Sequence, residues 1–144
     1  MSITLDQSRA VIAGAFAYRQ AHAMAPLCVC VLDAGGHVVA AEREDGASNG
    51  RFDVARGKAY GAISMGMSSR LLGDMAVTRP HFVAGVASAI GGSLVPVAGG
   101  LIVVDDDGQI FGAVGISGDN SDNDEAAAMA GIAAAGLRLV SSQP

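Results

Sequence analysis

Apolar residues between Leu5 and about Ala23 recur with the period of an α-helix. Thr4 stands directly before this segment, in the position of an N-cap whose side chain accepts a backbone hydrogen bond. Pro26 follows the segment, and a proline cannot continue a helix. The pattern therefore predicts an N-terminal helix. The positions that follow its spacing are Leu5, Ser8, Ile12, Ala15, Phe16 and Arg19.

The next apolar segment has the character of a buried strand. Residues 27–32 (LCVCVL) form a continuous β-prone run, residues 33–36 (DAGG) resemble a tight turn, and residues 37–43 (HVVAAER) return as a second strand. Because so short a turn joins only antiparallel strands, the pattern predicts a β-hairpin. Cys28 and Cys30 would point to the same face of the strand, which is a poor geometry for a disulfide, so we expect both to be reduced and in the core.

Helical spacing returns after a polar loop at residues 44–50. A second short helix is expected at residues 69–77. Residues 78–92 are predicted to be irregular, because they contain Pro80 and the pair Gly91 and Gly92. The first of these helices begins at about Arg51 and has one apolar face, formed by Phe52, Ala55, Ala59, Ala62 and Ile63.

Three short strands are predicted in the C-terminal part of the chain. Residues 94–95 and 101–104 are separated by Gly99 and Gly100, and residues 109–116 follow a turn of sequence DDDG. These strands form a meander, since the connections between them are short.

A final helix is predicted to run to about Val140. The spacing Ser121-x-x-Asp124 is typical of a capping box at its start. The order of elements is then helix, β-hairpin, two helices, β-meander and helix. It predicts an α/β (α+β) fold in which helices flank an antiparallel sheet. No repeat or linker interrupts the pattern, so we expect a single domain over residues 1–144.

Composition excludes several classes of function. The net charge is −5 with 9 Lys and Arg, and aromatic residues make up 4%, so we expect no nucleic-acid partner. No apolar run reaches the length of a membrane span, so we expect no membrane partner. The start, MSITLDQSRA, lacks the basic and apolar regions of a secretory signal, which favours a cytoplasmic location.

The segment GAVGISGDNSDNDEAAAMAG, residues 112–131, is the most unusual in the chain. A glycine-rich turn before a helix often binds phosphate, but four carboxylates here would repel an anion. Their ordinary role is to cap and stabilise the helix N-terminus. A cation site, a catalytic carboxylate, or a pairing with Lys58 or Arg43 are the alternatives. The four carboxylates are Asp119, Asp122, Asp124 and Glu125.

Lys58 and the three histidines are the other candidates for chemistry. Lys58 lies at the edge of the apolar face of its helix, where a lysine either extends to solvent or binds an anion in a pocket. His22, at a helix C-terminus, is favoured there by the helix dipole, and His37 is expected to be solvated. His81 follows Pro80 and is free to act as a ligand or as an acid or base. Their spacing matches no zinc motif, and no C-x-x-C-H motif for covalent haem is present.

Four segments in this order resemble the GlcG/HbpS-like family, which includes haem-binding regulators and the C-terminal domain of PduO-type cobalamin adenosyltransferases. The segments are VLDAGGHVVAAEREDGA, GKAYGA, PVAGGLIVV and GAVGISGDNSDNDEAAAMAG, and the resemblance covers roughly residues 5–138. It implies a profilin- or PAS-like fold with a five-stranded antiparallel sheet, and a homo-oligomer. It also implies haem as a cofactor in some members.

The resemblance also draws attention to particular residues. Asp124 is the acid that matches the family, Arg43 and Asp45 match its pattern at a strand end, and Glu44 departs from it because the family has an apolar residue there. His22 lies where a haem-ligating histidine is plausible by the resemblance. Arg43, Asp45, Lys58 and Asp124 could also form a buried ionic network without chemistry.

Two classes of function follow. The first is a small-ligand-binding protein that takes haem or another anionic molecule. Its iron ligand would be His22 or His81. The second is a small enzyme of the proton-transfer, isomerase or lyase type in organic-acid or aromatic-compound catabolism. Its candidate catalytic residues are Lys58, Asp124 and His81.

We expect the ligand in a shallow pocket beside the glycine turns, with Lys58 as the cation for its anionic group. The residues expected to bind it are Arg43, Asp45, Lys58, Gly91, Gly92, Gly99 and Gly100. The mean hydropathy of +0.41 leaves one subunit with little polar surface, so we expect a homo-oligomer. The alanine- and glycine-rich faces of residues 51–66 and 126–136 would allow helices of two subunits to approach closely.

Overall fold

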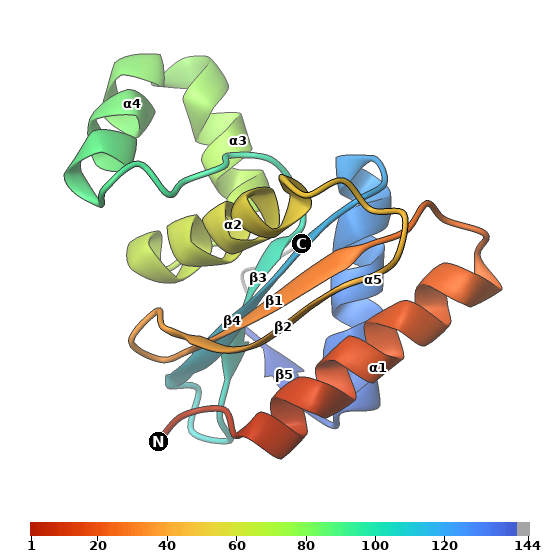
Figure 1. Cartoon of the computed structure of the whole chain (residues 1–144). Coiled ribbons are helices and arrows are strands. Elements are labelled where there is room, and N and C mark those ends of the chain that lie inside the picture. Colours follow the sequence, from red (N-terminus) through yellow and green to blue (C-terminus); the bar gives the residue numbers. More distant parts are fainter. Residues whose placement is uncertain (141–144) are drawn as a thin grey trace.

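The structure, a computed structural model, describes residues 1–140, and Figure 1 shows the arrangement of their helices and strands. The last four residues of the predicted domain lie outside this range. The N-terminal half contains α1 (Leu5–Ala21), β1 (Cys28–Asp33), β2 (Val38–Arg43) and α2 (Arg51–Met65). The remaining elements are α3 (Ser69–Thr78), α4 (Pro80–Ala89), β3 (Gly100–Val104), β4 (Ile110–Ser117), α5 (Ser121–Ala134) and β5 (Arg138–Leu139).

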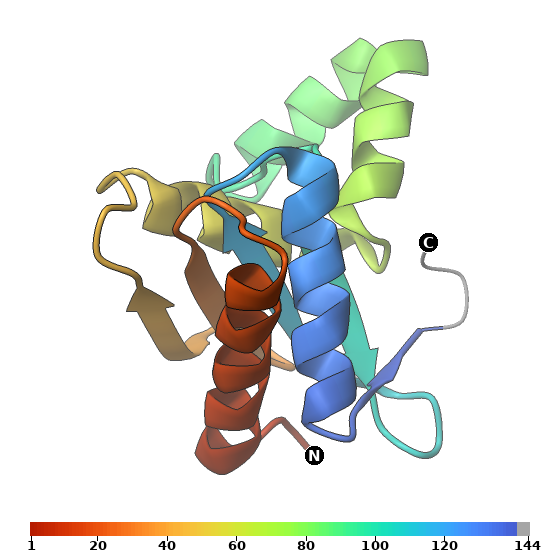
Figure 2. The same cartoon turned by 90° about the vertical axis from the view of Figure 1, so that its right-hand side faces the viewer.

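The five strands form one antiparallel sheet in the order β2-β1-β4-β3-β5, which confirms the predicted fold class. Residues Val29 and Val31 of β1 belong to a core shared with α1 and α5. Cys30 and Leu32 point to the other face and pack against α2. Helices therefore cover both faces, as Figure 2 shows for α1 and α5 on one side and α2 on the other. Burial on both faces explains why β1 is a continuous apolar run.

Small residues of the helices are used for packing within the chain. Gly14 of α1 faces α5, where an added Cβ would lie 2.7 Å from the Cβ of Ala134. A Cβ at Gly131 would lie 2.5 Å from the carbonyl oxygen of Val11. On the other face, a Cβ at Gly115 of β4 would collide with the carbonyl of Ala55 in α2. Much of the alanine- and glycine-rich surface that we expected between subunits thus joins helices and strands of one chain.

Two sequence predictions in the middle of the chain are wrong. Residues 78–92 are not irregular, because Pro80 occupies the first turn of α4, where its missing N–H costs nothing. Residues 94–95 do not form a strand. Leu94 packs in the core of α3 and α4, and the Val95 N–H donates to the carbonyl of Gly57 in α2 at 3.2 Å.

The final helix also differs from its prediction. It ends at Ala134 rather than near Val140, because Gly136 takes a left-handed conformation with φ of 72° and turns the chain back. Residues 138–139 then pair with β3 and supply the fifth strand. The predicted count of five strands is correct, but the fifth strand lies at residues 138–139 instead of 94–95.

The structure confirms the predicted N-cap of α1 and contradicts the one predicted for α5. Thr4 caps α1 as expected, and it forms a full capping box with Gln7. At α5 the capping box of Ser121 and Asp124 is wrong. Asn120 is the N-cap, with its side chain accepting from the N–H of Asn123 at 2.9 Å. The side chain of Asp124 is free for another role.

In the part of the chain that the structure describes, no helix has the length and apolar character needed to cross a membrane.

Candidate functional site

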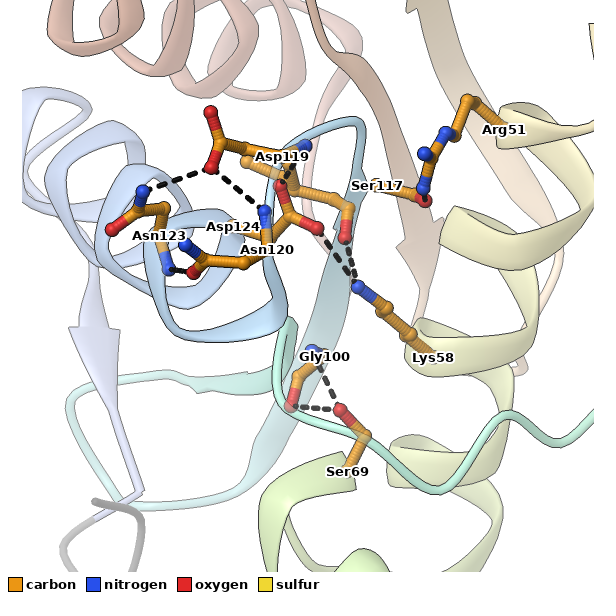
Figure 3. Close-up of polar contacts among 10 residues, drawn as sticks. Arg51, Lys58, Ser69, Gly100, Ser117, Asp119, Asn120, Asn123 and Asp124 are labelled. Carbon is orange, nitrogen blue, oxygen red and sulfur yellow. Dashed lines mark hydrogen bonds and ion pairs between the residues drawn. The ribbon is translucent and has the colours of Figure 1, made fainter. Parts of the chain in front are cut away.

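Lys58 and Asp124 form an ion pair in the interior (Figure 3). The helix α2 carries Lys58 over the sheet, and the first turn of α5 carries Asp124. Lys58 Nζ lies 3.1 Å from Asp124 Oδ2 and donates to the carbonyl of Ile116 in β4 at 2.8 Å. The side chains are 2% and 1% exposed, so Lys58 does not extend to solvent. The pair ties α2, β4 and α5 together at the C-terminal end of β4, the central strand of the sheet.

The neighbouring glycines are pressed against this lysine. A Cβ at Gly99 would lie 2.9 Å from Lys58 Nζ, and a Cβ at Gly100 would collide with the backbone carbonyl of Lys58. The hydroxyl of Ser69 in α3 accepts from the Gly100 N–H at 2.7 Å. The missing side chains let β3 approach α2 closely. These two predicted ligand-binding glycines therefore contact Lys58 itself.

Burial shifts both titrating groups toward their neutral forms. Desolvation lowers the pKa of Lys58, and the nearby Asp124 opposes this shift. Desolvation likewise raises the pKa of Asp124, against the effect of Lys58. The Asp119 N–H donates to Asp124 Oδ1 at 2.9 Å and so holds the carboxylate from its other side. Neither Lys58 nor Asp124 is among the lining residues of four surface hollows found on residues 1–140.

The other carboxylates of residues 112–131 have local partners. Asp119 accepts from the Ala25 N–H at 2.8 Å, and this bond is the largest of the causes that lower its pKa. Arg70 of α3 pairs with Asp122 and, through two nitrogens, with Glu125 at 3.1 Å. Nothing in the sequence indicated Arg70. Within residues 1–140 no three side chains are placed to hold a metal ion. The negative charge of this segment therefore serves capping and ion pairing.

Arg43 and Asp45 lie apart from Lys58 and Asp124, at the exposed end of β2. They line a surface hollow of about 450 Å³. Arg43 donates to the carbonyl of Ala47 at 2.7 Å, so the four-residue buried network that we considered is not formed. Glu44, which departs from the family pattern, pairs with Arg19 at 2.9 Å and accepts from the Leu27 N–H at 2.8 Å. It ties α1 to the start of β1.

His22 is the C-cap of α1, and its ring is held in place. Its Nδ1 lies 2.9 Å from the carbonyl oxygen of Tyr18, and its ring stacks on the Tyr18 ring with centroids 3.8 Å apart. A carbonyl oxygen only accepts, so Nδ1 must carry the proton of the neutral ring. The lone pair of the exposed imidazole then resides on Nε2, the nitrogen that a neutral imidazole offers to a metal.

The remaining predicted residues are distributed over separate parts of the surface. His81 is exposed on α4 and lines a hollow with Phe82. Gly92 lines a different hollow, between α2 and the segment after α4, and the adjacent Gly91 is exposed and has nothing within 4 Å of an added Cβ. His37 is 84% exposed beside Asp33 in the hairpin turn, as expected.

Comparisons with known proteins agree with this geometry. The chain is similar to PduOC in its complex with haem, at 25% identity and a TM-score of 0.84 over 96% of this chain and 98% of that one. It is similar to protein ORFY of Klebsiella pneumoniae, at 23% identity and a TM-score of 0.84 over 93% and 90%. It is also similar to a double mutant of Streptomyces reticuli HbpS, at 25% identity and a TM-score of 0.79 over 92% and 86%.

No curated protein sequence matches the chain. A model of the family described as haem-degrading protein HbpS-like, however, matches residues 3–133. The match spans strands β1 to β4 and all the helices except the last residue of α5, and it agrees with the resemblance seen in the sequence. The chain therefore belongs to the HbpS-like family.

Proposed function

We propose that this protein binds haem and that His22 supplies the axial ligand to the iron. The observation that carries the proposal is the exposed imidazole held by Tyr18, whose Nδ1 donates to the Tyr18 carbonyl and leaves the lone pair on Nε2. A metal-ligating histidine usually has its second ring nitrogen bound to a carbonyl or carboxylate in this way. Family membership and the haem complex of the similar PduOC domain support the same ligand.

Haem would supply an iron centre and two propionates, and the chain would supply the imidazole and the surface that receives the ring. Arg19, one turn before His22 in α1, is the nearest arginine along the helix, and it already pairs with Glu44 at 2.9 Å. Lys58 is a weaker candidate for a propionate than the sequence suggested, because its ammonium is enclosed by Asp124 and Ile116. His81 is the second candidate for the iron ligand, since it is exposed beside apolar side chains.

The experiment is a titration of haemin into the purified chain, followed by absorbance in the Soret region. The three histidines allow a matched set of variants. His22→Ala should weaken haem binding and remove the spectrum of the histidine complex. His37→Ala, at an exposed histidine of the hairpin turn, should leave both unchanged. If His81→Ala alone removes the complex, the ligand assignment moves to α4. If wild-type protein shows no saturable Soret band, the haem proposal is wrong.

We also propose that the protein resides in the cytoplasm and that it forms a homo-oligomer. Cys28 and Cys30 are both free and buried in the core, as a reducing compartment allows. Fractionation of cells that express the chain without a tag would test the compartment.

A further inference from the structure

A surface hollow of about 260 Å³ lies between α2 and the segment that follows α4. The two segments are joined where the Val95 N–H donates to the carbonyl oxygen of Gly57 at 3.2 Å. Gly57 makes this approach possible, because an added Cβ there would lie 2.7 Å from Val95 Cγ2. Since α2 covers the face of the sheet opposite to α1, the hollow lies on the other side of the sheet from His22.

One wall of the hollow carries an arginine that is held in place but not neutralised. Arg56 Nη1 donates to the hydroxyl oxygen of Ser93 at 2.9 Å, and its guanidinium lies over the Tyr60 ring, 5.1 Å from the centroid. A guanidinium has five N–H donors, and no carboxylate within residues 1–140 pairs with this one. The Ser93 N–H likewise has no acceptor among the described residues. The remaining donors of both residues are therefore available to an added carboxylate.

The same hollow carries a negative charge on α2. Asp53 stands three residues before Arg56, and both side chains line the hollow. Residues at this spacing share one side of a helix and often pair, yet no ion pair joins these two in the part of the chain that the structure describes. Val54 and Val95 add apolar walls. The hollow thus presents a cation, an anion and an apolar surface within one small volume.

We propose that this hollow binds a small α-amino acid with an aliphatic side chain. Arg56 and Ser93 receive its carboxylate, and Asp53 receives its ammonium group. Val54 and Val95 contact its side chain. Pockets for drug-sized ligands measure roughly 300–1,000 Å³, so a hollow of about 260 Å³ suits a smaller molecule. A ligand with only one of the two charges would leave the opposite protein charge partly desolvated and without a partner, which gives the site its specificity.

The first test is a titration of the isotope-labelled full chain with L-leucine to millimolar concentration, followed by nuclear magnetic resonance. Leucine should shift the amide resonances of Gly57 and Ser93 saturably and leave those of α1 unchanged. Two analogues separate its charged groups, since isocaproate lacks the ammonium group and isopentylamine lacks the carboxylate. Each should bind at least about tenfold more weakly than leucine, which is the effect of losing one hydrogen bond to a charged group.

Two substitutions assign the charges of the hollow. Arg56→Met keeps the stem of the side chain and should weaken binding of both leucine and isocaproate by about tenfold or more. Asp53→Asn keeps the shape and should weaken leucine binding by a similar factor. It should leave isocaproate binding unchanged or tighter, because the repulsion between two carboxylates is removed. Arg9→Met and Asp6→Asn are the matched controls, since both residues are exposed on α1, and they should leave leucine affinity unchanged.

Binding of leucine should be independent of haem. Arg56→Met should retain the haemin titration of wild type, His22→Ala should retain the affinity for leucine, and melting temperatures should show that the variants fold. The comparison of leucine with its two analogues needs only the wild-type chain, so it remains decisive if a variant does not fold. The proposal is wrong if leucine gives no saturable shift, or if the shifts map to α1 instead of the hollow. It is also wrong if Asp53→Asn binds leucine as tightly as wild type, because the ammonium group is then not recognised.

Discussion

Replacing Lys58 by Met distinguishes a structural ion pair from a ligand-binding lysine. The substitution retains most of the stem and removes the charge, the bond to Ile116 and the bond to Asp124. Asp124 then remains in the interior, 1% exposed, with the Asp119 N–H as a hydrogen-bond donor. Removing one partner of a buried pair typically costs about 3–5 kcal/mol, because the other charge is left uncompensated.

For a chain of this size, each kcal/mol lowers the melting temperature by about 2–4 °C. Lys58→Met should therefore melt roughly 6–20 °C below wild type by calorimetry or circular dichroism. Adding Asp124→Asn to this variant should restore most of the loss, since no buried charge remains and the amide oxygen still accepts from Asp119. Arg138→Met is the control, because this arginine is 60% exposed and its pair with the exposed Asp106 is screened by solvent. It should cost about 1 kcal/mol or less.

The stability of the Lys58→Met variant should change with pH in a definite direction. Without Lys58, the folded-state pKa of Asp124 lies further above its unfolded value, since the ammonium no longer opposes the effect of desolvation. Folded Lys58→Met then binds a proton that the unfolded chain does not, so its stability falls as the pH rises from the unfolded pKa to the folded one. The deficit relative to wild type should be smaller near pH 4 than at pH 7. An unchanged melting temperature with lost haem affinity would show that Lys58 serves the ligand and would refute the structural assignment.

Three further measurements test other details of the structure. Asn120→Ala should cost about 0.5–2 kcal/mol in denaturant unfolding, because it removes the cap of α5, and Ser121→Ala should cost clearly less. Burial raises the pKa of Cys30 to about 12, so its thiol should resist a thiol reagent at pH 8 in the folded protein and react once the protein is unfolded. The pKa of Asp119 is lowered chiefly by the Ala25 N–H, so its contribution is present above the unfolded pKa and is lost as the pH falls through the folded one. Wild type should accordingly lose more stability than Asp119→Asn on acidification below about pH 4.

Local sequence patterns were sufficient to predict those helices and strands whose intrinsic preferences agree with their tertiary contacts. The hairpin of β1 and β2, the cap at Thr4 and the helix α2 all follow from period, turn chemistry and propensity. The prediction failed at α4, since Pro80 both interrupts α3 and begins the next helix. It failed again at β5, because a strand of two residues has no periodicity and depends on pairing with β3.

The site could be predicted only in part, because its contacts are long-range. The pattern singled out Lys58 and Asp124, but these residues are 66 positions apart and only the fold brings them together. The spacing of Ser121 and Asp124 indicated a cap, yet the buried lysine attracts the carboxylate more strongly than a helix terminus does. The sequence held one indication that Lys58 is buried. This lysine stands between small residues, Gly57 and Ala59, and a helix with such small side chains packs closely against its neighbours and leaves a long side chain little access to water.

The same close packing constrains where a ligand can bind. Gly115 and Gly100 let α2 lie so near the sheet that even a methyl group would collide with its backbone. Gly14 and Gly131 do the same between α1 and α5. A flat ligand as large as haem therefore has no room between either helical layer and the sheet at these points. If the chain binds haem as proposed, the ring would lie against the outside of the fold, where His22 and His81 are exposed, and the proposed second subunit would cover the part of the ring that a single chain leaves in water.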